Sequence, residues 1–149
     1  MATPKLNPHF LEFLRCFAVH KVRYLLIGGY AVGFHGWPRN TKDIDLWIGG
    51  DEENQARVIG ALREFAFPAI EDDLLREESV IVRFGVPPHR IEILRAVSGL
   101  VFDDAWQNRM MWAGEAFEIP VIGLADLRRN KAASGRHQDL ADLEHLPEV

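Results

Sequence analysis

The sequence predicts a mixed α/β (α+β) domain, built on a small mixed sheet of about four or five strands with helices packed mainly on one side. Short apolar runs bounded by glycine and proline indicate strands, and apolar residues three or four positions apart indicate helices between them. Two strands lie only four residues apart, which predicts an antiparallel pair because parallel neighbours need a long crossover. Residues 1–149 are long enough to bury one substantial core, so a single domain is expected.

The composition is ordinary for a soluble globular protein, with 48% hydrophobic and 26% charged residues. The net charge of −5 argues against coating nucleic acid without regard to sequence, which needs clustered Lys and Arg, but it leaves room for a local basic site. Neither a long apolar run nor a signal-peptide pattern occurs, so we expect a cytoplasmic protein with no membrane partner. The one cysteine, Cys16, excludes an internal disulfide and a cysteine-based zinc site.

The first predicted helix covers residues 7–20 and carries an apolar stripe that would cover one side of the sheet. The stripe consists of Phe10, Leu11, Leu14, Phe17 and Ala18. A buried strand is predicted next, over residues 24–27, followed by a glycine turn, a short helix over 30–35 and a polar loop over 36–42.

The glycine turn, Gly28 and Gly29, predicts a phosphate-binding site. Glycine has no Cβ, so the backbone can turn tightly and a ligand can approach its amide groups closely. The helix that follows directly would offer free N–H groups and a dipole that favour an anion.

Two carboxylates, Asp43 and Asp45, stand at the start of the next predicted strand, residues 43–48. Side chains alternate between the two faces of a strand, so both acids point to one side while the apolar Ile44 and Leu46 point to the other. Hard cations such as Mg²⁺ (or Mn²⁺) are held by one or two carboxylates together with substrate phosphates. A phosphate-binding turn beside a metal-binding pair of acids suits a nucleoside triphosphate (NTP) and its metal.

The glycine pair followed by Asp43-Ile44-Asp45-Leu46 resembles the signature of the DNA-polymerase-beta-like nucleotidyltransferase superfamily. A fuller resemblance, to the small bacterial AbiEii-type nucleotidyltransferases, covers most of the chain from residue 24 to 146. It is carried by Tyr30, Ala31, His35-Gly36, Arg39, Thr41 and Lys42, and near the C-terminus by Ile119-Pro120-Val121, Leu124, Asp126-Leu127, Lys131, Gly135-Arg136, Asp139 and Asp142-Leu143. The resemblance implies the nucleotidyltransferase fold and the transfer of a nucleoside monophosphate from an NTP to a hydroxyl.

The remaining elements are predicted from the same two patterns, short apolar runs for strands and apolar residues three or four positions apart for helices. Strands are predicted over 79–85, 90–97 and 116–121. Helices are predicted over 52–65, 102–114, 124–134 and 138–146. Asp51 is expected to cap the helix that follows it, and Gly135 to end its helix in left-handed geometry.

A third acid, Glu92, stands on the predicted strand 90–97 where the superfamily pattern commonly has an aspartate. The resemblance implies that it completes the metal site with Asp43 and Asp45, although its side chain is one methylene longer than the pattern has. It could instead act as the base that takes the proton from the acceptor hydroxyl, or mark a weakened site. The alternative is a surface glutamate on a half-exposed strand.

Three basic residues, Arg39, Lys42 and Lys131, are candidates for binding the nucleotide phosphates. Arg39 and Lys42 could instead form ion pairs with the two acids. Lys131 and its neighbour Arg136 could instead lock the last two helices together through Asp139 and Asp142, which share a helix face.

Two further readings of function stay open. Glutamate at position 92 and the short chain also fit an inert nucleotide-binding or protein-interaction module of the same fold. The AbiEii-type resemblance also suggests the toxin half of a toxin–antitoxin pair with a cognate antitoxin. The acceptor (an RNA end, a protein side chain or a small molecule) is not fixed by the sequence.

Overall fold

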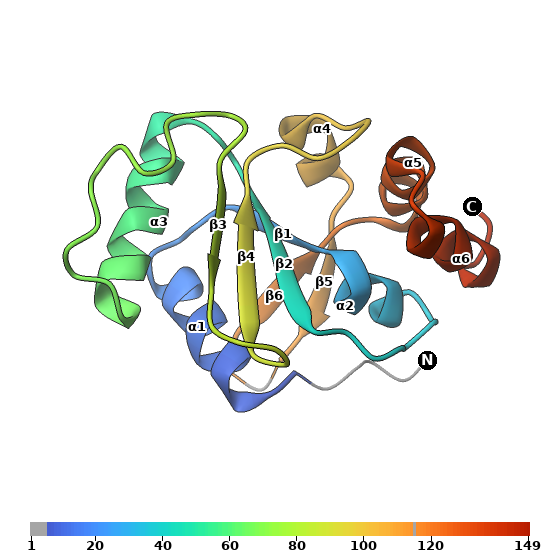
Figure 1. Cartoon of the computed structure of the whole chain (residues 1–149), viewed down its shortest axis with the longest axis horizontal. Helices are drawn as coiled ribbons and strands as arrows, with labels where there is room; N and C mark the ends of the chain where they lie inside the picture. Colours follow the sequence, from blue (N-terminus) through green and yellow to red (C-terminus); the bar gives the residue numbers. More distant parts are fainter. Residues whose placement is uncertain (1–5, 115) are drawn as a thin grey trace.

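The computed structural model describes residues 6–114 and 116–149, and within them six strands form one mixed sheet in the order β3-β4-β2-β1-β6-β5 (Figure 1). The strands are β1 (Tyr24–Ile27), β2 (Asp43–Ile48), β3 (Ile81–Phe84), β4 (Arg90–Leu94), β5 (Met110–Ala113) and β6 (Glu118–Val121). The helices are α1 (Pro8–Val19), α2 (Gly28–Phe34), α3 (Glu52–Phe65), α4 (Phe102–Gln107), α5 (Leu124–Ser134) and α6 (His137–His145). The mixed α/β architecture predicted from the sequence is confirmed.

Local sequence signals set several helix ends. The Asn7 side chain accepts a hydrogen bond from the Phe10 N–H at 2.9 Å, and Asp51 accepts one from the Asn54 N–H at 3.1 Å. Each carboxyl or amide oxygen satisfies one of the N–H groups that the first turn of a helix leaves free. At the other end of a helix, Gly135 follows α5 with φ of 65°, the left-handed geometry predicted for it.

The register of the sheet places the acids of β2 beside the acid of β4. β2 pairs with β1 in antiparallel fashion and with β4 in parallel, so Asp45 lies between Ile27 and Glu92. β3 and β4 form the predicted antiparallel hairpin, which sets Arg83 opposite Glu92. Residues paired across neighbouring strands share a face, so the acids and Arg83 project to the same side.

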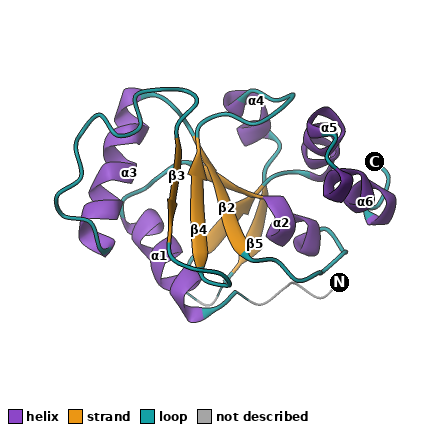
Figure 2. Cartoon of the chain, in the orientation of Figure 1, coloured by secondary structure: helices purple, strands orange, loops and turns teal. Residues whose placement is uncertain are grey.

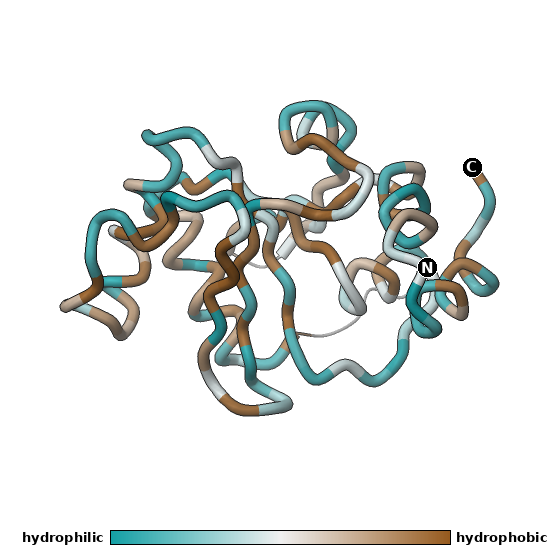
Figure 3. Tube along the Cα trace, turned by 45° about the horizontal axis from the view of Figure 1, so that its top comes forward, coloured by the Kyte–Doolittle hydropathy of each residue, from teal (hydrophilic) through white to brown (hydrophobic). Residues whose placement is uncertain are grey.

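The opposite face of the sheet is apolar and packs against α1 and α3. Ile44 and Leu46 are fully buried there. The rings of Phe13 and Phe84 meet edge to face at 5.4 Å, and helix α1 thereby contacts the edge strand β3. Hydrophobic residues concentrate along the central strands, whereas the connecting loops are largely hydrophilic (Figure 3). This packing makes the sheet a rigid support for the acids on its other side.

The helix predicted over 102–114 is confirmed only in its first half, and the expected strand number is wrong. The helix ends at its C-cap residue, Asn108, and Met110–Ala113 form the edge strand β5, which pairs with β6. The strand is labelled β5 among the strands of the sheet in Figure 2. Tertiary pairing overrides the helical spacing of Trp106 and Met110, and this hairpin is what raises the sheet to six strands. Within the described part of the chain, no helix combines the length and the hydropathy needed to cross a bilayer.

Candidate active site

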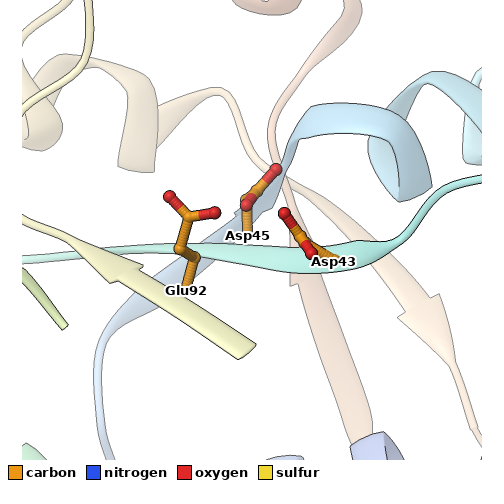
Figure 4. Close-up of side chains that lie close together, drawn as sticks. All are labelled: Asp43, Asp45 and Glu92. Carbon is orange, nitrogen blue, oxygen red and sulfur yellow. The ribbon is translucent and has the colours of Figure 1, made fainter. Parts of the chain in front are cut away.

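Asp43, Asp45 and Glu92 project from neighbouring strands to the same side of the sheet (Figure 4). One carboxylate oxygen of each lies within 4.8 Å of the others. The side chains of Asp43 and Glu92 are 20% and 15% exposed, so the cluster is reachable from solvent but largely walled by protein. The structure therefore brings together the three acids that the sequence singled out.

Asp45 is the most electrostatically strained of the three acids. Burial, followed by the nearby charges of Glu92 and Asp43, raises the pKa of Asp45 to about 7. The positive charges of Lys131 and Arg136 oppose this rise. Without an added cation, this carboxyl holds its proton close to neutral pH, because ionisation would add a third negative charge to a partly dry site.

Two arginines that sequence reasoning missed neutralise the other two acids. Arg90 donates two hydrogen bonds to Asp43, from Nε to Oδ1 at 2.8 Å and from Nη2 to Oδ2 at 3.0 Å. This contact lowers the pKa of Asp43. Arg83 donates from Nη2 to Oε1 of Glu92 at 3.1 Å. Arg90 is two residues before Glu92 on the same strand, so strand alternation alone places Arg90 on the acid face. The signal for Arg90 was therefore present in the sequence.

The glycine turn lies against the Asp45 carboxylate. Gly28 has φ of +70°, and a Cβ there would overlap the Asp45 carboxylate. The position therefore requires glycine both for its backbone geometry and for the close approach of the two strands. A Cβ on Gly29 would lie 3.0 Å from the Thr41 side chain and 3.2 Å from Nη1 of Arg39. The short helix predicted from residue 30 in fact begins at Gly28.

Arg39 and Lys42 do not pair with the acids as one alternative expected. The Arg39 guanidinium donates to both carboxylate oxygens of Asp142, at 2.9 and 3.0 Å, and so ties the loop before β2 to α6. Lys42 is exposed, and within the described residues it forms no ion pair. Thr41 donates a hydrogen bond to the Asp43 carbonyl at 3.0 Å and orders the same loop.

Lys131 lies at the centre of a buried ion network that holds α5 against α6. Its Nζ lies 3.2 Å from Asp139 and 3.0 Å from Asp142, and the residue is 4% exposed. Arg136 adds a contact from Nε to Asp139 at 2.8 Å. The pairing predicted as the structural alternative is therefore present. The network also anchors Arg39, because Asp142 is shared between Arg39 and Lys131.

Several solved structures match this chain, and one of them is described in words that bear on function. It is a Thermotoga maritima protein described as a "putative nucleotidyltransferase", with a TM-score of 0.58 and 17% identity over 94% of this chain and 93% of that chain. The chain has a nucleotidyltransferase-like fold. No protein-family model and no curated protein matches the sequence. The AbiEii-type assignment stays a prediction.

Proposed function

We propose that this protein is a metal-dependent nucleotidyltransferase that moves a nucleoside monophosphate from an NTP to a hydroxyl acceptor. The observation that carries the proposal is the meeting of Asp43, Asp45 and Glu92 on one face of the sheet, directly beside the Gly28 turn. A fold shared with a protein described as a nucleotidyltransferase supports the same reaction class.

The acid cluster fits a hard divalent cation. Carboxylate oxygens are the ligands that Mg²⁺ and Mn²⁺ prefer. One oxygen from each of the three acids lies within 4.8 Å of the others, so the three side chains could turn toward a shared cation. When bound, the cation would neutralise charge on the α-phosphate and on the attacking and leaving oxygens. For the cation to bind Asp43, the Arg90 guanidinium would have to give up its contact with at least one of the Asp43 carboxylate oxygens.

The proposed roles of the surrounding residues follow from their places. Backbone N–H groups at Gly28 and Gly29 would bind phosphate oxygens, since neither glycine has a side chain of its own to keep a ligand away. Arg39, whose Nη1 lies beside Gly29, would contact the same phosphates while Asp142 fixes its orientation. Lys42 would contact the phosphates from the solvent side, and Lys131 would act through its charge, because its Nζ is engaged by two aspartates.

The reaction would form a bond between the acceptor oxygen and the α-phosphorus. The bond from that phosphorus to the oxygen bridging to the β-phosphate breaks, and pyrophosphate leaves. Glu92, which stands on β4 on the far side of β2 from the glycine turn, would take the hydroxyl proton directly or through water, or serve as a ligand.

Calorimetric titration tests the proposal first. Each NTP is titrated with and without Mg²⁺ into the wild type and into Asp43→Ala, and we expect metal-dependent binding that the substitution removes. An acceptor screen with labelled NTP then compares the wild type with Asp45→Ala. Equal transfer rates in the two proteins, with both folded, would contradict the proposed chemistry.

The second candidate is a module of the same fold that binds a nucleotide without turnover. The observation that favours it is that arginines already occupy two of the three acids, Asp43 and Glu92. NTP binding that does not depend on Mg²⁺ and survives Asp43→Ala would support this module and exclude the transferase.

A further inference from the structure

The arrangement of the sheet fixes the side from which an acceptor would approach. The Gly28 turn and Arg39 lie on the β1 side of the acids, and β4 and then β3 lie on the other side. In phosphoryl transfer the attacking and leaving oxygens stand roughly in line on opposite sides of the phosphorus. If the β- and γ-phosphates occupy the glycine turn, the acceptor hydroxyl must enter from the β3–β4 side.

The acid face on that side carries two guanidinium groups. Arg90 and Arg83 stand on neighbouring strands, paired with Asp43 and Glu92. Arg83 is 51% exposed and Arg90 31% exposed on their side chains, so both can move without disturbing the core. Among the described residues, the only carboxylates that the two arginines contact are the proposed metal ligands Asp43 and Glu92.

We propose that Arg83 and Arg90 bind the acceptor, and that the acceptor carries a phosphate group beside its reactive hydroxyl. The inference rests on the proposed function. A divalent cation between the acids competes with both arginines for their carboxylate partners. The guanidinium groups are then left next to a cation at the mouth of the site, where they repel it unless an anion enters between them.

A phosphate group is the anion that this pair suits best. Arginine presents a planar fork of N–H donors that matches phosphate oxygens in bidentate geometry, and two forks on adjacent strands can hold one phosphate from two directions. A neutral hydroxyl compound carries no negative charge that could replace the carboxylate contacts of the two guanidinium groups. The same chemistry can come from two sources, the end of an RNA chain or a small sugar phosphate.

The test uses the full chain and three variants: Arg83→Gln, Arg90→Gln and the control Arg76→Gln. Arg76 is also a surface arginine paired with an aspartate, Asp73, but it lies outside the acid face. Binding is measured with Mn²⁺ and a non-hydrolysable NTP analogue present. The probes are a fluorescein-labelled RNA hexamer with a free 3′-hydroxyl, ribose 5-phosphate and uncharged ribose.

We expect Arg83→Gln and Arg90→Gln each to weaken probe binding at least about tenfold, because each removes a charge-assisted contact. Their affinity for Mn²⁺ should stay equal or increase, since a competing cation is gone, and Arg76→Gln should match the wild type. Tighter binding of the hexamer than of ribose 5-phosphate identifies a nucleic-acid end, and the reverse identifies a sugar phosphate.

Two outcomes separate the possible failures. If the wild type binds no NTP analogue with Mn²⁺, the proposed function and this inference both fall. The inference alone is overturned if the NTP analogue binds every variant but either of two results is seen. In the first, the phosphate probes bind Arg83→Gln and Arg90→Gln as tightly as they bind Arg76→Gln. In the second, the phosphate probes bind the wild type no more tightly than ribose does.

Discussion

Replacing Asp45 with asparagine should stabilise the metal-free protein at neutral pH, although it removes a proposed metal ligand. The pKa of Asp45 is raised from 3.8 to about 7, so the folded protein holds this proton more tightly than the unfolded chain does. The contribution of Asp45 to stability is therefore greatest below about pH 4 and falls as the pH rises to about 7. The difference between the two pKa values corresponds to about 4 kcal/mol of stability, all of which is lost once the pH is above both values. Asp45→Asn has no carboxyl proton to lose, so its stability lacks this dependence on pH.

Urea unfolding in EDTA, followed between about pH 4.5 and 7.5, measures this effect. We expect the free energy of unfolding of the wild type to fall by at least about 1 kcal/mol relative to Asp45→Asn across this range. Adding Mg²⁺ should then stabilise the wild type, because a ligand that binds only the folded state favours it, and should leave Asp45→Asn unchanged. Parallel pH profiles for the two proteins would refute the reasoning.

Asp43→Asn is the matched control, because it makes the same change two residues away on the same strand. The pKa of Asp43 is lowered, chiefly by its hydrogen bonds from Arg90. Its ion pair therefore contributes stability above its ordinary pKa that is lost as the pH falls through the folded value. At neutral pH we expect Asp43→Asn to be less stable than the wild type, the opposite sign to Asp45→Asn.

Three further predictions concern the surroundings of the acids. Gly28→Ala should abolish Mg²⁺-dependent NTP binding and lower the melting temperature, because a Cβ would overlap Asp45 at a positive φ; a normal melting temperature would contradict this. Lys131→Met should lower the free energy of unfolding, measured with urea, by about 3–5 kcal/mol, because it leaves two buried aspartates short of a partner. A loss below about 1 kcal/mol would contradict this, because it is the size expected of a solvent-exposed ion pair. Arg90→Gln should tighten Mn²⁺ binding in calorimetry by freeing Asp43, and weaker binding would show that the arginine supports the metal site.

Much of the site was predictable because its residues are close in sequence or obey strand alternation. Asp43 and Asp45 share a face by spacing alone, and Glu92 joins them because β2 and β4 pair in register. The strand β5 was not predictable, because Met110 and Met111 continue the helical spacing that begins at residue 102 and the strand forms only against β6. The antitoxin partner, the acceptor and the cytoplasmic location stay predictions.

The pairing of Arg39 with Asp142 could not be read from the sequence, because nothing local relates residues 103 positions apart. Sequence reasoning offered the nearest acids, Asp43 and Asp45, as partners. In the fold, however, Arg90 holds Asp43, and the Gly28 turn lies against the Asp45 carboxylate. Arg39 instead turns toward α6, where Asp142 is fully buried.

That long-range pair also sets an order of assembly. The sheet that carries the three acids needs residues only up to the end of β6, at Val121. The orientation of Arg39 needs Asp142, which lies in the last helix. A chain emerging from the ribosome can therefore complete the acid cluster before it completes the proposed phosphate site. The proposed phosphate site therefore depends on the α5–α6 hairpin, whereas the acid cluster does not.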